Sequence, residues 1–239
     1  MNNILKKVLW VLFLGLLLLG VPRLSGMLAS LFDFQRIDPD GAYAWISLHH
    51  IIQALIFIII IFIINKFRNI NFGFNWGNKE IGKKYVMWFF IIFGIGSLVS
   101  HILLILTDSF QHFGYPLTAS NIIGQLGFQL LLSGPSEELI FRAFAITMLG
   151  LMLKGRFYKR KLSSANIIAA VIFGLAHVGI SFVPFELRYD LFQVILAVIL
   201  GLFYGDCYEK TNSMYYPMIM HSMSNVIMVG YTIIATIIL

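Results

Sequence analysis

Charged residues and cysteine are scarce in this sequence. Lysine, arginine, aspartate and glutamate make up 12% of its 239 residues, whereas an ordinary soluble domain carries roughly 25%. Hydrophobic residues make up 59%, too many to hide in one core, because a domain of this size still has a large surface to cover with polar groups. A water-soluble globule is therefore excluded, and the sequence predicts a protein embedded in lipid.

The single cysteine, Cys207, cannot form an internal disulfide, so no covalent cross-link is expected in the fold. The sequence also lacks a paired-cysteine motif and the His-Glu-x-x-His zinc motif. The net charge of +6 is basic, but in a lipid-embedded chain it favours cytoplasmic loops over contact with nucleic acid. We expect the bilayer as a partner and no nucleic acid.

Long apolar stretches mark the expected spans, since about 30 Å of hydrocarbon requires about 20 residues at roughly 1.5 Å per residue. About seven candidates are found, at residues 7–22, 46–65, 85–107, 120–153, 164–184, 188–206 and 217–239. The first begins near Lys6 and Lys7, as a signal peptide does, but no small-residue cleavage site follows it, and we expect a retained helix. The predicted fold is an all-α, polytopic transmembrane helical bundle.

Lysine and arginine are distributed unevenly between the predicted loops. The N-terminus and the loops at 66–84 and 154–161 carry most of them, and under strict alternation these segments lie on one side. Only Arg23, Arg36 and Arg188 face the other side. By the positive-inside rule, the N-terminus and both basic loops are predicted to face the cytoplasm.

Three charged residues fall deep inside a predicted span, namely Glu137, Glu138 and Arg142. Glu138 and Arg142 are four residues apart, so on a helix they share a face and can form an ion pair. Glu137 points about 100° away and is not easily neutralised by the same arginine. A second carboxylate inside a membrane is energetically unfavourable, and loss of hydration and the acidic neighbour should raise its affinity for a proton. A carboxylate with a raised proton affinity is suited to act as a general base near neutral pH.

Polar partners for this carboxylate are predicted on other spans. His177 lies at the end of Phe-Gly-Leu-Ala-His in the fifth span, and His221 shares a helix face with Asn225 in the seventh. The remaining histidines have no evident partner in the sequence, and we expect them to be structural or interfacial: His49, His50, His101 and His112.

The ordered set Glu-Glu-x-x-x-Arg, Phe-x-x-x-His and His-x-x-x-Asn resembles the CPBP family of intramembrane proteases. This family, also called Abi, includes type II CAAX prenyl endopeptidases and bacteriocin-processing or immunity proteins. The resemblance covers roughly residues 120–230, and the flanking Ser163-Ser164 and Pro217 also fit it. One departure is Ala143, where many members have a glycine after the arginine.

The resemblance implies a role for each matched position. Glu137 and His177 would activate a water molecule, and His221 and Asn225 would bind the oxyanion of the tetrahedral intermediate. Three further residues would be structural or orienting: Glu138, Arg142 and Phe173. Residues 120–239 would then form the catalytic core, and residues 1–119 an N-terminal region of about three spans.

The implied activity is cleavage of a membrane-associated peptide, either a lipidated protein or a small peptide precursor such as a bacteriocin. No cofactor is implied. We expect an integral protein of a bacterial plasma membrane. Three alternatives stay open: a zinc metalloprotease built from the same side chains, a proton-coupled transporter in which embedded Glu and His relay protons, and a non-catalytic membrane scaffold.

Overall fold

Five helices among the described residues are long and apolar enough to cross a membrane. The computed structural model describes residues 3–157, 162–182 and 184–239, so residues 158–161 of the predicted basic loop lie outside the described part. The five helices are α1 (Asn3–Ala29), α2 (Ala44–Phe67), α3 (Lys79–Leu106), α8 (Leu191–Thr211) and α9 (Tyr215–Ile238). Helix α1 packs against α2, and α3 packs against α9.

Large apolar side chains cover the outside of these helices. Leu16 on α1 is 76% exposed, Phe62 on α2 is 71% exposed and Ile92 on α3 is 67% exposed. So many exposed apolar groups would be unfavourable in water but are favourable against lipid tails. The expected all-α helical bundle is confirmed, while the number of spans stays a prediction.

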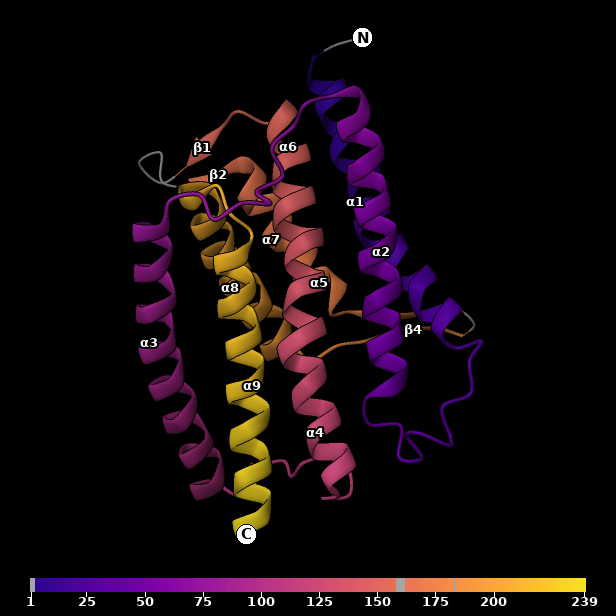
Figure 1. Ribbon diagram of the computed structural model, residues 1–239, viewed down its shortest axis with the longest axis vertical. Coiled ribbons are helices and arrows are strands. Elements are labelled where there is room, and N and C mark those ends of the chain that lie inside the picture. Colours follow the sequence, from indigo (N-terminus) through magenta and orange to yellow (C-terminus); the bar gives the residue numbers. More distant parts are fainter. Residues whose placement is uncertain (1–2, 158–161, 183) are drawn as a thin grey trace.

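One irregular helix forms the centre of the bundle (Figure 1). It runs from residue 119 to 152 through five consecutive pieces: α4 (Ala119–Phe128), η1 (Gln129–Ser133), α5 (Gly134–Glu138), η2 (Leu139–Ile146) and α6 (Thr147–Met152). The two η pieces are π-helical, and such widened turns often occur at functional sites. They lie on either side of α5, which carries both glutamates.

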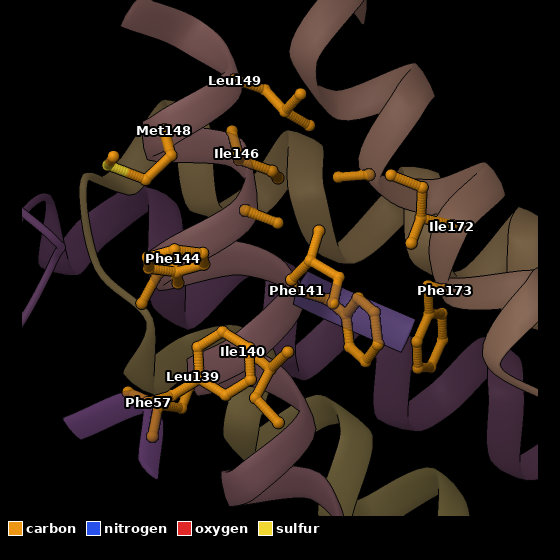
Figure 2. Close-up of a cluster of buried hydrophobic side chains, with 14 of the residues drawn as sticks. Phe57, Leu139, Ile140, Phe141, Phe144, Ile146, Met148, Leu149, Ile172 and Phe173 are labelled. Atoms are coloured by element: carbon orange, nitrogen blue, oxygen red, sulfur yellow. The ribbon is translucent and has the colours of Figure 1, made fainter. Parts of the chain in front are cut away.

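The apolar core surrounds the second π-helical piece (Figure 2). Every residue of η2 is buried, as expected for a helix that is enclosed on all sides. Phe144 packs edge-on against Phe57 of α2, and Phe141 contacts Phe173 of α7 (Ser164–Ala176). The core therefore fixes α5 and η2 against both halves of the chain.

The predicted fifth span, 164–184, is wrong at its C-terminal end. Helix α7 ends at Ala176, and a hairpin of β3 (Gly179–Phe182) and β4 (Phe185–Arg188) follows it. Apolar and polar residues alternate from Ile180 to Phe182 and from Phe185 to Arg188, which is the period of a strand. The 13 residues of α7 extend only about 20 Å, less than the hydrocarbon thickness.

A second, smaller hairpin precedes α7. Its strands are β1 (Arg156–Phe157) and β2 (Leu162–Ser163). The Ser163 hydroxyl accepts a hydrogen bond from the Asn166 N–H at 2.9 Å and so caps the start of α7. Helix α7 then packs along α8 and ends at mid-height in the bundle (Figure 1).

Asp38 anchors the loop between α1 and α2. Its carboxylate accepts N–H hydrogen bonds from Ala42, Tyr43 and Ala44 at 2.7–2.8 Å. Burial favours the neutral acid, but these three donors outweigh it and hold the pKa of Asp38 below its usual value. The Gln125 side chain donates to the Ala42 carbonyl, so the loop ties the start of α2 to α4.

Candidate active site

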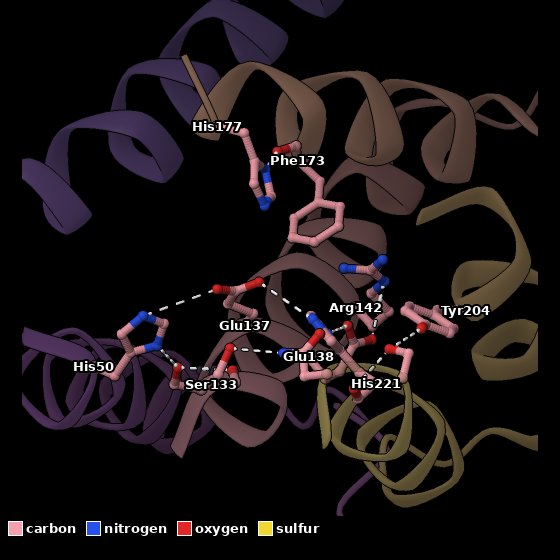
Figure 3. Close-up of polar contacts among 12 residues, drawn as sticks. His50, Ser133, Glu137, Glu138, Arg142, Phe173, His177, Tyr204 and His221 are labelled. Atoms are coloured by element: carbon pink, nitrogen blue, oxygen red, sulfur yellow. Dashed lines mark hydrogen bonds and ion pairs between the residues drawn. The ribbon is translucent and has the colours of Figure 1, made fainter. Parts of the chain in front are cut away.

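The four side chains proposed for catalysis line one cavity of about 340 Å³. Figure 3 shows Glu137, His177 and His221. Glu137 comes from α5, His177 follows the last turn of α7, and His221 and Asn225 come from α9. Residues that lie up to 88 positions apart in the sequence thus converge as the motif order suggested. Their roles in a reaction stay a prediction.

Gly134 allows α9 to approach the central helix at this level. A Cβ atom at position 134 would lie 2.6 Å from the Ser222 hydroxyl and 2.7 Å from its backbone nitrogen. Ser222 directly follows His221, so the two helices meet where the cavity residues are held. A larger residue here would push α9 away from α5.

We expect Gly134→Ala to lower any activity of the site by roughly 10- to 100-fold, because displacements of about 1 Å can cost that much. Gly127→Ala is the matched control, since it lies on the same irregular helix and its Cβ would meet nothing within 4 Å. Thermal unfolding of both variants in detergent should accompany the activity measurement. Equal activity in the two variants would contradict the importance of this close approach.

Glu138 and Arg142 form the ion pair that their spacing predicts. Arg142 Nε lies 3.0 Å from Glu138 Oε2, and both side chains are buried, with 0% and 1% exposed. His221 Nδ1 donates to Glu138 Oε1 at 2.7 Å. The Arg142 guanidinium also lies 4.5 Å from the centre of the Phe173 ring. Glu138 is thus occupied on both oxygens and unavailable to the cavity.

Tyr204 completes this buried network and was missed in the sequence. Its ring stacks on His221 at 5.3 Å and lies 5.4 Å from the Arg142 guanidinium. Its hydroxyl is hydrogen-bonded to Ser224 at 2.9 Å. A tyrosine in an apolar span is common, so no local signal distinguishes it.

Glu137 faces the cavity instead of the buried network. Its side chain is 18% exposed, and its Oε2 lies 3.6 Å from His221 Nε2. The neighbouring Glu138 points to a different side of the helix, which agrees with the predicted rotation of about 100° between adjacent residues. Glu137 therefore has free lone pairs in a space that water can enter.

His177 presents one free nitrogen to the same space. Its Nδ1 lies 2.9 Å from the Phe173 carbonyl, and because a carbonyl can only accept, Nδ1 must carry the hydrogen. The Nε2 atom of the neutral ring is then an acceptor, and Figure 3 shows it directed toward Glu137. Helix α7 ends at Ala176, so His177 lies directly beyond its last turn.

Asn225 lies one helical turn beyond His221. Its amide donates to the Ser133 hydroxyl at 3.0 Å, which uses one of its two N–H groups. The second N–H remains available to a bound group. Asn225 is half-buried, so its amide is accessible from the cavity.

His50 on α2 is a further cavity residue, and the expectation that it lacks a partner was wrong. Its Nε2 lies 3.9 Å from Glu137 Oε1, across from His221. Its Nδ1 contacts the Ser136 hydroxyl at 2.7 Å and accepts from the Gln53 amide at 3.0 Å. A polar signal was present, because Gln53 follows His50 by three residues in an otherwise apolar span.

The other histidines, His49, His101 and His112, are not among the described residues that line this cavity. His101 is held between the Ser97 carbonyl and the Thr232 hydroxyl at 2.8 and 3.1 Å, which fits the expected structural role. His49 stacks on Trp45, and His112 packs edge-on against Phe110. Among the described residues no group of three or more His, Cys, Asp or Glu could hold a metal ion, so we derive no step through a metal.

A family model matches part of the chain. A family model described as "Type II CAAX prenyl endopeptidase Rce1-like" matches residues 119–227, a range that contains all the motif residues from Glu137 to Asn225. His50 lies outside that range. Neither curated proteins nor solved structures give a match to the chain.

Proposed function

We propose that this integral membrane protein is an intramembrane endopeptidase related to the Rce1-like type II CAAX prenyl endopeptidases, whose family model matches residues 119–227. Its substrate would be a membrane-associated or small peptide, lipidated or not. The proposal rests on the different surroundings of the two glutamates. Glu138 is neutralised by Arg142, whereas Glu137 faces an accessible cavity that three histidines share.

Glu137 and His177 are the pair proposed to activate water. A water molecule between the carboxylate and the free Nε2 of His177 can lose its proton to Glu137 as its oxygen attacks the peptide carbonyl carbon. The tetrahedral intermediate then breaks its C–N bond, and the proton is passed on to the leaving amine. No side-chain nucleophile is required.

His221 and Asn225 are proposed to stabilise the oxyanion. Asn225 can donate its second N–H. His221 already donates Nδ1–H to Glu138, so donation from Nε2 requires both ring nitrogens to carry hydrogen. A carboxylate faces each ring nitrogen, since Nδ1 lies 2.7 Å from Glu138 Oε1 and Nε2 lies 3.6 Å from Glu137 Oε2.

His50 is proposed to position Glu137 from the side opposite His221. The Gln53 amide donates to Nδ1, which leaves the hydrogen of a neutral ring on Nε2, facing Glu137 Oε1. The 3.9 Å separation is longer than a hydrogen bond, and such contacts tighten when a substrate is bound. The N-terminal region would thus contribute to a site whose motif lies in residues 120–239.

Replacement of His50 by glutamine should therefore lower kcat by about 10- to 100-fold with a smaller change in KM. The matched control is His101→Gln, since His50 and His101 are both 6% exposed and hydrogen-bonded but only His50 faces Glu137. Gln53→Leu keeps the His50 ring but removes its donor, so a smaller loss of the same kind is expected. Steady-state kinetics in detergent gives both constants, and equal losses in the His50 and His101 variants would reduce His50 to a packing role.

The orientation of the chain stays part of the proposal. The N-terminus, the segment that joins α2 to α3 and the β1–β2 hairpin lie at one end of the bundle, opposite the C-terminus (Figure 1). This end carries most of the lysines, which supports a cytoplasmic N-terminus under the positive-inside rule. A bacterial plasma membrane is the proposed location.

A cleavage screen tests the proposed activity. Purified wild-type chain and Glu137→Ala would be reconstituted in liposomes with a mixture of membrane peptides, some of them lipidated, and the products identified by mass spectrometry. We expect new peptide ends from the wild type alone. Identical product lists from the two proteins would reject an activity based on Glu137.

A further inference from the structure

A groove of about 530 Å³ lies between α3 and α9 at the basic end of the bundle, away from the cavity that holds Glu137. Lys79 and Lys83 line it, and Val86, Met87 and Ile219 form an apolar wall. Along α3 the two lysines come first and the apolar residues follow one to two turns deeper. The groove is therefore positively charged near the helix start and apolar toward the membrane interior.

The two lysines present uncompensated charge to the groove. They are four residues apart on α3, so both ammonium groups lie on one helix face. Both are exposed, and within the described part of the chain neither has an ion-pair or hydrogen-bond partner. The two ammonium groups repel each other, and their spacing of about 6 Å along the helix lets both contact one phosphate.

Aromatic residues fix the walls at the same level. The Trp76 ring is tilted against the Tyr215 ring at 4.8 Å and lies edge-on to the Tyr216 ring at 5.6 Å. Gly82 lies against the Tyr216 ring so closely that no Cβ atom would fit, which brings α3 and α9 together behind the groove. Tryptophan and tyrosine are typical of the boundary between hydrocarbon and headgroups, so the groove lies where a phospholipid headgroup lies.

We infer that this groove is a binding site for one anionic phospholipid. The phosphate would lie between Lys79 and Lys83, and an acyl chain would run along Val86, Met87 and Ile219. A soluble phosphate would use only the charged half of the site. An uncharged lipid would use only the apolar half, whereas an anionic phospholipid fits both.

Lipid retention tests this inference in the full-length protein. The chain would be equilibrated in bilayers of equal phosphatidylglycerol and phosphatidylcholine, extracted in mild detergent and weighed by native mass spectrometry. We expect the wild type to retain more phosphatidylglycerol than phosphatidylcholine. In the double variant Lys79→Gln, Lys83→Gln the ratio of retained phosphatidylglycerol to phosphatidylcholine should fall at least 10-fold. Lys84→Gln is the matched control, because it is an exposed neighbour on the same helix that does not line the groove.

Other outcomes would overturn the inference. An equal loss in Lys84→Gln would mean a diffuse charge effect, and equal retention of both lipids would leave only an apolar groove. Displacement by soluble glycerol phosphate would assign the site to free phosphate. Lys79→Arg with Lys83→Arg keeps the charges and should retain the lipid, which guards against a folding defect in the double glutamine variant, and Glu137→Gln should bind lipid as the wild type does.

Discussion

Glu137→Gln is expected to abolish peptide cleavage while the protein still folds and inserts. The amide keeps the shape of the side chain but cannot take a proton from water, and general-base catalysis typically contributes about 10²–10⁴-fold. Among the described residues Glu137 takes part in no buried ion pair with arginine, so its neutralisation should leave thermal unfolding nearly unchanged. Cleavage rates and unfolding temperatures in the same detergent check both halves of the prediction.

Replacement of the adjacent Glu138 should affect stability, unlike replacement of Glu137. Glu138→Gln removes the charge that neutralises Arg142, and an uncompensated buried charge typically costs about 3–5 kcal/mol. This variant should therefore lose stability as well as activity. Glu80→Gln, on the first turn of α3, should change neither. Near-normal turnover by Glu137→Gln would remove the general base from the proposed mechanism.

Loss of the proposed oxyanion donors should have the next largest effect. Asn225→Ala and His221→Ala should each lower kcat by about 10²–10³-fold with a smaller change in KM, because these donors act on charge that develops during the reaction. His221→Ala should also reduce stability, since it leaves Glu138 Oε1 without its donor. Asn225→Ala should not, because its side chain is only half-buried.

Ser133→Ala separates oxyanion binding by Asn225 from simple packing. It removes the partner of the Asn225 amide but keeps the amide itself, so the loss in kcat should be well below that of Asn225→Ala. Measurement of kcat and KM for the three variants is sufficient. An effect confined to KM would assign His221 and Asn225 to substrate binding.

The buried ion pair and the cavity residues could be predicted because placing a polar group in lipid costs much free energy, so few are found there without a role. With charges scarce in the spans, Glu137, Glu138 and Arg142 stand out, and the four-residue spacing predicts which glutamate meets the arginine. His177, His221 and Asn225 followed from the order of the motifs. Their convergence on one cavity needs the packing of α7 and α9 around α5.

The remaining features depend on tertiary contacts or on local shape. The π-helical turns beside α5 have no sequence signature in the apolar run from residue 119 to 152. Average hydropathy does not distinguish a full span from the short α7 followed by a hairpin, although the alternation around Ile180 carries that information. The sequence carries a polar signal for His50 in the nearby Gln53, but the position of His50 opposite Glu137 depends on the packing of α2 against α5.

We propose that Glu137 directs water onto a peptide bond without a metal ion. The most direct test is cleavage in ¹⁸O-labelled water by chelator-treated, reconstituted protein, using a peptide identified in the liposome screen. We predict that the wild type places one ¹⁸O atom in each new carboxyl terminus after a single turnover and that Glu137→Gln yields no labelled product. Labelled product from Glu137→Gln, or cleavage by the wild type that stops on chelation and returns with added zinc, would contradict this mechanism.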